Sequence, residues 1–544
     1  MNFMRNESAR KLRGGYYTPP DLAAYLARWV AQGGASRILE PSCGDGVFFD
    51  ALASVNMRND PSVLGFELDA EEAGKARSKC SSMAAEIRAE DFLAWAIGEM
   101  RAGRAEFDAA LGNPPFVRYQ YLPEAFQFRA ETVFDLLGLK FTKHTNAWVS
   151  FVLASMAVLS PGGRLAMVVP SEIVHVTHAQ SLRTYLGRVC SRLLVVDPEE
   201  IWFDGTQQGA VMLLAEKKRH PDQRIEGLGI LPVRGRAFLS NDPESVFTGV
   251  VRTNGPSVEG KWTRALLTSH ERALLDRAAT RPQVHGFKTI AKVDVGIVTG
   301  ANGFFLVPDE TVRRYDLAKW AHPMFGRSGH CPGIIYDDRQ HRANSEKGNP
   351  TNFLRLTGEL TRKARDYIRL GESQGLDTRY KCRIRTPWYT VPSVYATDIG
   401  MLKRSHDTPR LIRNEIGAYT TDTAYRITTK TGAADRLVYS FLNGLTALCA
   451  ELEGRCYGGG VLELVPSEIE RLLVPVPERM TVDLEALDHA VRSMPMDVVL
   501  ERQTARVLGA IGFSPTDQAD LLAAWSRLRN RRQRNSGDAL PDEA

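Results

Sequence analysis

The first 215 residues alternate short apolar runs with segments of helical spacing, and this alternation limits the possible folds more than any other feature of the chain. The candidate strands are 37–40, 63–68, 107–111, 164–169, 192–196 and 210–215, and the candidate helices are 19–31, 47–54, 70–84, 147–159 and 177–189. Strands that alternate with helices form parallel sheets with helices on both faces. The sequence therefore predicts an α/β fold with a parallel, doubly wound, Rossmann-like sheet.

The pattern changes after about residue 225, where segments become short, mixed and rich in turn residues. Such a change marks a new domain more often than a continuation of the same sheet. We expect a first domain at 1–225, a connecting segment at 226–285 and a second domain of mixed α+β type at 286–526. Residues 527–544 combine a basic cluster with polar residues, and we expect a flexible tail there.

Charge is distributed unevenly along the chain. Residues 1–220 contain 24 Lys and Arg against 25 Asp and Glu, whereas residues 321–440 contain 20 basic and 12 acidic side chains. A basic second half indicates a polyanionic partner, and a solvated basic face is the alternative. No apolar run approaches the roughly 20 residues that span a bilayer, so we expect no membrane association.

The seven cysteines are dispersed, and no C-x-x-C pair occurs among them. A disulfide framework and a zinc site both require closer or paired spacing. The expected setting is therefore a reducing cytoplasm, and we expect no bound metal.

Three features follow the candidate strands of the first domain. Gly44 and Gly46 form a turn after the first strand, where backbone can approach a ligand closely. Glu67 ends the second strand at a position suited to accept hydrogen bonds from a ribose. Asp91 and Phe92 could contact a nucleobase. Each feature also has a structural alternative. The two glycines could form an ordinary tight turn, Glu67 could cap the next helix, and Asp91 with Phe92 could be a helix cap and a core residue.

The most specific motif is Asn113-Pro114-Pro115-Phe116, which follows the third of these strands. Ligands bind at the carboxyl ends of strands in open α/β sheets. The two prolines hold the backbone extended, so the Asn113 amide oxygen and the Pro114 carbonyl can accept both hydrogens of a planar exocyclic amine. Phe116 offers a ring face for stacking. A Pro-Pro turn in an ordinary loop is the alternative.

These motifs, in this order, resemble the gamma class of amino-methylating DNA methyltransferases, and more narrowly the adenine-N6 enzymes of bacterial restriction–modification systems. The segments that carry the resemblance are Tyr17-Thr18-Pro19-Pro20, Glu40-Pro41-Ser42-Cys43-Gly44-Asp45-Gly46, Glu67, Asp91-Phe92 and Asn113-Pro114-Pro115-Phe116. Softer matches at 295–302, 414–426 and 455–463 resemble the target-recognition domain of these enzymes. The resemblance implies a class I methyltransferase sheet followed by a DNA-recognition domain.

The resemblance also implies S-adenosylmethionine as the cofactor. The residues that it assigns to cofactor binding are Tyr17, Thr18, Glu40, Ser42, Cys43, Gly44, Asp45, Gly46, Glu67, Asp91, Phe92 and Asn113. In this assignment the 42–46 turn holds the amino-acid end, Glu67 the ribose hydroxyls, and Asp91 with Phe92 the adenine ring. Cys43 itself needs to be no more than a small packing residue.

For the target base, the resemblance assigns catalysis to Asn113, Pro114 and Phe116, with Phe116 stacking on a flipped-out adenine. The family often has Tyr where this chain has Phe116, and stacking needs only the ring face. A second aromatic wall would come from Phe203, for which a core position is the alternative.

Duplex DNA is the implied partner, with a cognate endonuclease as a separate chain and an undetermined oligomeric state. Arg379, Lys381, Arg383, Arg385 and Trp388 alternate cations with an aromatic ring, which suits contact with phosphates and bases.

Two other functions remain open at this point. A methyltransferase of the same fold could act on RNA or on a protein glutamine, although such enzymes usually lack a basic C-terminal domain of this size. A catalytically silent DNA-binding component of a defence system could also keep the fold, and the intact Glu67, Asp91 and Asn113 argue against it.

Overall fold

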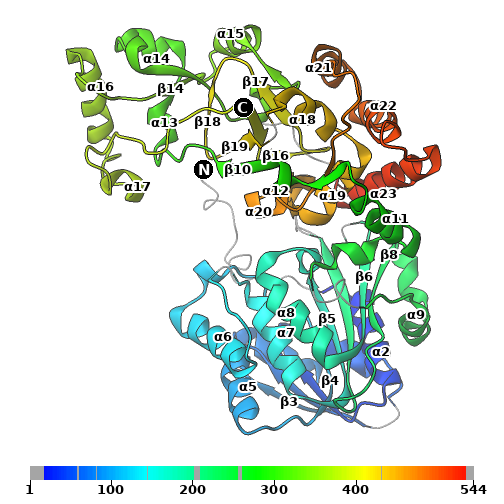
Figure 1. The fold of residues 1–544 in the computed structure, drawn as a ribbon. Coiled ribbons are helices and arrows are strands. Elements are labelled where there is room, and N and C mark those ends of the chain that lie inside the picture. The colour runs from blue at the N-terminus through cyan, green and yellow to red at the C-terminus, as the bar shows by residue number, and fades with distance from the viewer. Residues whose placement is uncertain are drawn as a thin grey trace. The chain divides into compact units, whose positions relative to one another are not determined.

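The protein divides into two compact units in a computed structural model, which describes residues 18–57, 60–80, 83–143, 145–200, 202, 209–254, 260–430 and 432–533 (Figure 1). The first unit extends to Leu266 and the second runs from Leu267 to Gln533. This division falls inside the 226–285 segment for which the sequence predicts a connection between domains.

The first unit is built on an eight-stranded sheet with the order β3-β2-β1-β4-β5-β7-β6-β8. Its strands are β1 (Arg37–Glu40), β2 (Ser62–Phe66), β3 (Ala84–Arg88), β4 (Phe107–Gly112), β5 (Leu159–Pro170), β6 (Cys190–Pro198), β7 (Ala210–Lys217) and β8 (Gly227–Val233). Strand β7 is antiparallel to both of its neighbours, β5 and β6, and the other neighbouring pairs are parallel. The chain order reverses direction beside β1, where β2 lies on one side and β4 on the other.

The prediction of a purely parallel sheet is therefore wrong at β7. The connection between β6 and β7 spans residues 199–209 and is too short for a helical crossover, which a parallel pairing would need. Strands β3 and β8 were not predicted from the sequence. Strand β8 pairs with β6 in register from Arg192 opposite Gly227 to Pro198 opposite Val233, so part of the expected connection completes the sheet.

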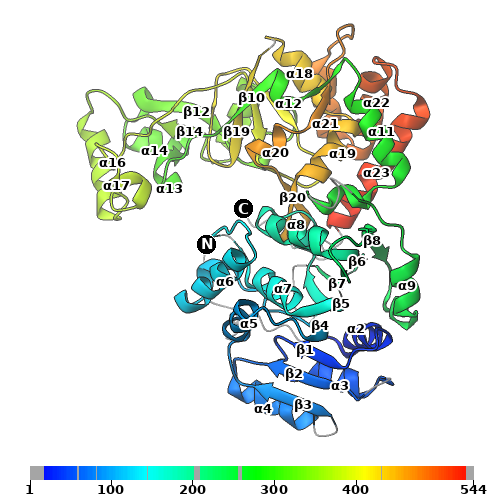
Figure 2. The same ribbon diagram turned by 60° about the horizontal axis from the view of Figure 1, so that its bottom comes forward.

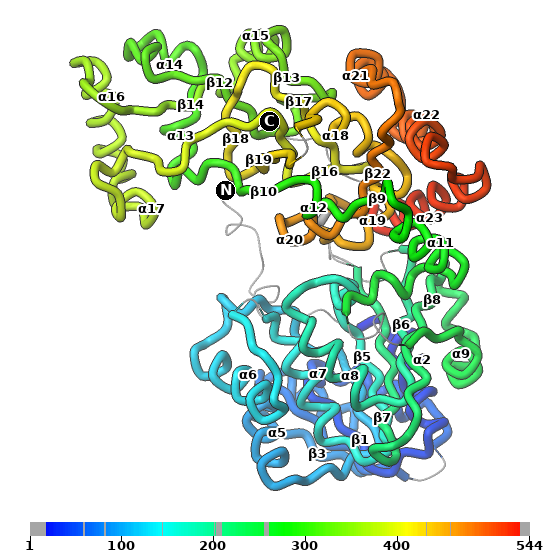
Figure 3. Tube along the Cα trace, in the orientation of Figure 1, coloured from blue at the N-terminus to red at the C-terminus, as the bar shows by residue number. Residues whose placement is uncertain are grey.

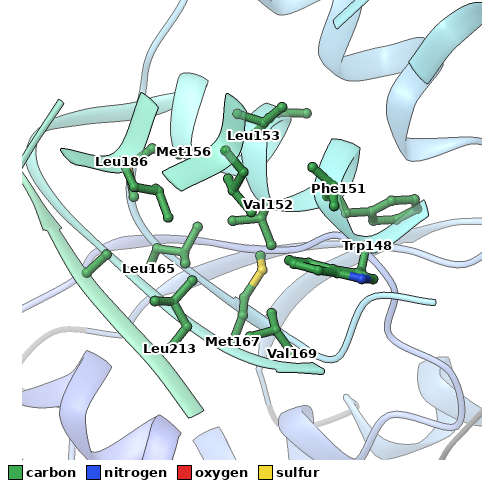
Figure 4. Close-up of a cluster of buried hydrophobic side chains, with 14 of the residues drawn as sticks. Trp148, Phe151, Val152, Leu153, Met156, Leu165, Met167, Val169, Leu186 and Leu213 are labelled. Carbon is green, nitrogen blue, oxygen red and sulfur yellow. The ribbon is translucent and has the colours of Figure 1, made fainter. Parts of the chain in front are cut away.

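Helices cover both faces of this sheet (Figure 2). They are α2 (Pro20–Gln32), α3 (Val47–Ala53), α4 (Ala70–Lys79), α5 (Phe92–Arg101), α6 (Glu124–Leu136), α7 (Ala147–Ala157), α8 (Gln180–Val189) and α9 (Pro243–Gly249). Helices α5 to α8 bury one core against the sheet, and Figure 4 shows its centre, where Trp148 and Val152 of α7 lie over Leu165 and Met167 of β5. Helices α2, α3, α4 and α9 bury a second core on the opposite face.

The second unit combines several small sheets with helices, as the α+β prediction requires. Its largest sheets have the orders β10-β19-β15-β17-β13 and β11-β14-β12-β18, and smaller ones join β16-β21-β20 and β22-β9. The strands are β9 (Val284–Gly286), β10 (Ala291–Val295), β11 (Leu306–Val307), β12 (Ala321–Phe325), β13 (Ile335–Tyr336), β14 (Asn352–Leu354), β15 (Ile399–Leu402), β16 (Arg404–Ser405), β17 (Leu411–Asn414), β18 (Tyr419–Thr420), β19 (Ala424–Thr429), β20 (Arg455–Tyr457), β21 (Val461–Glu463) and β22 (Leu473–Pro475).

Helices of the second unit alternate with its strands along the chain, as the trace in Figure 3 shows. They are α11 (Ser269–Ala279), α12 (Phe287–Ile290), α13 (Asn302–Phe305), α14 (Asp309–Arg314), α15 (Asp338–Glu346), α16 (Arg362–Ser373), α17 (Tyr380–Arg383), α18 (Ala434–Phe441), α19 (Gly444–Glu453), α20 (Pro466–Ile469), α21 (Leu484–Ser493), α22 (Met496–Gly509) and α23 (Pro515–Gln533). Helices α16 and α17 lie next to one another in all three views.

Helix α23 extends into the segment for which the sequence predicts a tail. Arg532 Nη2 donates to Glu451 Oε1 at 2.7 Å, and both side chains are buried. An arginine that pairs with a buried carboxylate is fixed in position, so residues 527–533 are part of the folded unit.

Candidate functional site

The turn after β1 is shaped by two glycines. Gly44 and Gly46 have φ values of 51° and 88°, in the left-handed region that side chains other than glycine rarely adopt. A Cβ atom on Gly46 would lie 2.9 Å from Ala76 Cα of α4, so no larger residue fits without a shift. The turn places the start of α3 at the carboxyl end of β1.

Glu40, the last residue of β1, is a buried carboxylate. Its side chain is fully buried, and neither Oε1 nor Oε2 has a hydrogen-bond partner among the described residues. Burial, and then the nearby Glu67 and Asp45 carboxylates, raise the pKa of Glu40 well above its usual range, whereas Lys79 opposes this shift. Buried polar groups are nearly always paired, so an unpaired carboxylate marks a place for a donor supplied from outside the chain.

Glu67 joins the ends of β1 and β2. Its Oε2 accepts from the Gly44 amide at 3.0 Å, and its Oε1 accepts from the Asp69 amide at 2.9 Å. The helix-cap alternative does not apply to Glu67, because Asp69 caps α4 by accepting from the Glu71 and Glu72 amides. A carboxylate has about four acceptor positions, so Glu67 keeps capacity for two further donors.

Asp91 caps a helix and Phe92 is a core residue, which are the structural roles named above as the alternative to nucleobase contact. Asp91 Oδ1 caps α5 by accepting from the Leu93 amide at 2.8 Å and the Ala94 amide at 3.2 Å, and its Oδ2 accepts from Arg129 Nη1 at 2.5 Å. Phe92 is buried, with its ring 5.3 Å from that of Phe151. Contact between these residues and a nucleobase stays a prediction.

The Asn113–Phe116 loop follows β4 and is held from two sides. Ser42 Oγ of the β1 turn donates to the Asn113 carbonyl at 3.0 Å, and the Ala147 amide of α7 donates to the Val117 carbonyl at 2.9 Å. Pro114 is buried, and Phe116 is half-buried against both cores of the unit. The loop is therefore fixed beside the β1 turn.

The structure thus brings most of the predicted site residues of the first unit to one edge of the sheet. Ser42, Glu67, Asp91 and Asn113 all follow neighbouring parallel strands at their carboxyl ends. Thr18 precedes α2 and is buried. Burial raises the pKa of the Cys43 thiol, which fits a packing residue better than a nucleophile. Tyr17 and Phe203 lie outside the described residues.

Leu68 is a residue of this edge that sequence reasoning missed. It directly follows Glu67, and 72% of its surface is exposed. A large apolar side chain in this position suits a flat apolar ligand surface. The available signal was an apolar residue between two acidic residues at the end of a strand.

In the second unit, the predicted basic cluster separates into two groups. Arg385 donates from Nη1 to the Thr299 carbonyl at 2.7 Å and from Nη2 to the Val298 carbonyl at 2.9 Å. Trp388 donates to Glu372 at 3.1 Å and packs its ring against Phe304. Both residues have structural contacts within the second unit, and their contact with a polyanion stays a prediction.

The other three cations, Arg379, Lys381 and Arg383, are exposed on and beside α17. Lys381 and Arg383 each lie 5.6 Å from the ring of Tyr380, which is 63% exposed. Ile384 follows with 61% exposure. Residues 362–385 contain eight basic and three acidic side chains, and α16 adds exposed basic residues beside α17. We define the α17 patch as the exposed residues Arg379, Tyr380, Lys381, Arg383 and Ile384.

The softer sequence matches contain residues with structural contacts. Asn414 Nδ2 donates to the Thr397 carbonyl at 2.8 Å and its Oδ1 accepts from the Ala418 amide at 2.9 Å. Arg426 donates to the Ser393 and Val295 carbonyls. These two residues shape turns of the second unit.

Several other properties bear on function. All seven cysteines are free. Within the described ranges, no cluster of three or more His, Cys, Asp or Glu side chains is arranged to hold a metal ion. No helix in the part of the chain that the structure describes combines the length and apolar character needed to cross a membrane.

Comparison with known proteins adds family information to this geometry. Residues 2–226 match the family model described as N-6 DNA methylase, and residues 259–508 match the C-terminal domain of the type II methyltransferase M.Eco57I. The type II methyltransferase M.AccI of Acinetobacter calcoaceticus is 22% identical over 500 residues, which cover 88% of this chain and 87% of that protein. M.XamI of Xanthomonas campestris pv. amaranthicola is 23% identical over 484 residues, covering 86% of each chain.

Among solved structures, the type IIG restriction endonuclease BpuSI aligns with a TM-score of 0.44 and 13% identity, over 97% of this chain and 67% of that one. The two family models match the two parts of the chain in the order that the sequence motifs predict. Together, the N-6 DNA methylase match at 2–226, the M.Eco57I-type C-terminal match at 259–508 and the type II methyltransferases that align along most of the chain identify a DNA methyltransferase of a restriction–modification system.

Proposed function

We propose that this enzyme transfers a methyl group from S-adenosylmethionine to the N6 atom of an adenine that is flipped out of duplex DNA. The observation that carries this proposal is the position of the Asn113–Phe116 loop at the end of β4, tied by Ser42 to a turn that lies beside an unpaired, buried carboxylate. The match of residues 2–226 to the N-6 DNA methylases supports adenine as the target.

The first unit has side chains that fit S-adenosylmethionine. Glu40 offers a buried carboxylate without a partner, which suits the ammonium group of the methionine part. The remaining acceptor positions of Glu67 suit the ribose hydroxyls, and Leu68 offers an exposed apolar face to the adenine ring. When bound, this cofactor supplies a methyl group activated by a neighbouring sulfonium.

The chain's own contribution to the chemistry is to orient the target amine. In the proposed complex the Asn113 side-chain oxygen and the Pro114 carbonyl accept the two N6 hydrogens, which favours a lone pair directed at the methyl donor. Phe116 stacks on the base, and Phe203 is proposed as the second aromatic wall. Alignment of the reacting atoms and exclusion of water supply most of the rate.

The α17 patch is proposed as a DNA contact of the second unit. Arg379, Lys381 and Arg383 would contact phosphates, and the exposed Tyr380 ring would stack against a base or sugar. A DNA substrate and seven free cysteines fit the bacterial cytoplasm. A cognate endonuclease would be a separate chain.

Charge reversal in this patch tests its role. The double variant Arg379→Glu/Arg383→Glu should weaken DNA binding about tenfold or more at low salt and reduce the slope of log K against log salt by about two, because two phosphate contacts are lost. Fluorescence anisotropy over a series of salt concentrations measures both quantities.

The matched control is Lys319→Glu/Arg502→Glu, which changes the net charge equally at exposed positions elsewhere on the same unit. The control should keep the wild-type salt slope. If both double variants behave alike, the effect comes from total charge, and the α17 patch is a solvated face.

The choice of substrate is tested by offering labelled S-adenosylmethionine to the purified enzyme with duplex DNA, ribosomal RNA or a peptide release factor in parallel. We expect incorporation into DNA alone, since the basic second unit suits a long polyanion and the family acts on DNA. Preferential labelling of RNA or protein would replace the proposed substrate. No incorporation and no cofactor binding in calorimetry would indicate a silent DNA-binding component.

A further inference from the structure

Asn146 is an asparagine at a helix N-terminus that does not cap its helix. It occupies the N-cap position of α7, where asparagine normally accepts a hydrogen bond from a backbone amide of the first turn, yet its side chain makes no such bond. The side chain is only 7% exposed, and Oδ1 has no hydrogen-bond partner among the described residues.

Asn146 also lies beside the loop that the proposed reaction uses. Its backbone forms an antiparallel bridge with Arg118, and the next residue, Ala147, donates to the carbonyl of Val117, the residue that follows Phe116. The unpaired oxygen therefore belongs to the part of the fold that holds the Asn113–Phe116 loop in place.

Two facts together point to a ligand. A buried acceptor without a donor is unfavourable in the ligand-free protein and is rare in folded proteins. A second set of unpaired buried acceptors, on Glu40, lies at the end of β1, which is the neighbour of β4 in the sheet. Unpaired acceptors therefore lie at the end of β1 and beside Val117 and Arg118, the residues that follow the Asn113–Phe116 loop, and a ligand with N–H donors would pair them.

We infer that Asn146 Oδ1 accepts a hydrogen bond from the exocyclic amine of a bound adenine ring. The inference rests on the proposed function, in which two adenine rings are present, one in the cofactor and one in the target. A side-chain amide is complementary to the edge of adenine, because it can accept from N6 and donate to a ring nitrogen.

The near-isosteric variant Asn146→Leu tests this role. Removal of an unpaired buried oxygen should leave the Tm of the ligand-free protein unchanged or raise it, whereas a structural hydrogen bond would lower the Tm when lost. If the cofactor adenine is the partner, the Kd for S-adenosylmethionine in calorimetry should rise about tenfold. If the target adenine is the partner, this Kd should stay constant and kcat on unmodified genomic DNA should fall about tenfold or more.

Two further variants make the result specific. Asn146→Asp keeps an acceptor oxygen and should recover part of the lost affinity or turnover. Ser155→Ala removes another unpaired buried oxygen from the same helix, nine residues further on, and should change neither quantity.

A lowered Tm for Asn146→Leu, or wild-type Kd and kcat in that variant, would overturn the inference. These results differ from a failure of the proposed function, in which the wild-type enzyme itself would not bind the cofactor or methylate DNA.

Discussion

The variant Asn113→Ala should reduce kcat on DNA about a thousandfold while the dissociation constants for DNA and S-adenosylmethionine change less than about threefold. The amide oxygen of Asn113 is proposed to act on the target amine as it becomes the nucleophile, so its loss affects the transition state more than either bound ground state. Removal of one preorganised hydrogen-bonding group typically costs 10²–10³-fold in kcat.

Single-turnover methylation with labelled cofactor measures the chemical step directly, and anisotropy and calorimetry measure the two binding constants. Asn113→Asp keeps an acceptor oxygen, so its kcat on DNA should lie between those of the wild type and Asn113→Ala. The backbone of this loop is held by Ser42 and Ala147, so the substitution should leave the fold intact. Near-normal turnover by Asn113→Ala would contradict the proposed role of the loop.

The variant Glu40→Gln should stabilise the ligand-free enzyme and weaken cofactor binding about 30-fold, which corresponds to about 2 kcal/mol. Burial and neighbouring carboxylates raise the pKa of Glu40 well above its usual range, so ionising this group in the folded state is costly. Glutamine has a similar shape and removes that cost. It also removes the negative charge that we propose to pair with the ammonium group of the cofactor.

The same shift predicts a pH dependence with a definite sign. Between the ordinary glutamate pKa and the raised pKa of the folded state, the folded protein binds more protons than the unfolded chain, so the contribution of Glu40 to stability falls as pH rises through this interval. The stability of Glu40→Gln should not show this part of the decrease with rising pH. Urea unfolding of the ligand-free proteins at several pH values compares the two.

Cofactor binding to the wild-type enzyme should release a proton, because an ammonium group favours the ionised form of Glu40. Calorimetry in buffers of different ionisation enthalpy detects this proton, and Glu40→Gln should abolish it. A Glu40→Gln enzyme that binds the cofactor normally, or that is less stable than wild type at neutral pH, would show that Glu40 has another partner.

The strands and helices of the first unit, which depend on local sequence patterns, could largely be predicted. The alternation of strands and helices predicts the sheet, and the Gly44–Gly46 turn and the Asn113–Phe116 loop lie at strand ends as expected. The reversed strand β7 was not predicted, because strand direction depends on the length of a connection and on which neighbours remain unpaired. Apolar runs look the same in either direction.

The roles of individual side chains were harder to predict from the sequence. Arg385 and Trp388 have the same residue types as a DNA-contact cluster, yet their partners are backbone carbonyls and rings that lie far away in the sequence. The sequence did not mark Asn146 as unusual, because only its burial and its missing hydrogen-bond partner in the structure distinguish it from an ordinary helix cap. Properties of this kind come from tertiary packing, which spacing does not encode.

If the Asn113–Phe116 loop presents an adenine amine for methylation, the enzyme and its Asn113→Ala variant should leave different marks on cellular DNA. The modified nucleosides can be measured by mass spectrometry of DNA from cells that lack other methyltransferases and express either protein. We expect N6-methyladenine with the wild type and none above background with the variant at equal protein level. Methylation of cytosine instead of adenine, or equal N6-methyladenine in both cultures, would contradict this role of the loop.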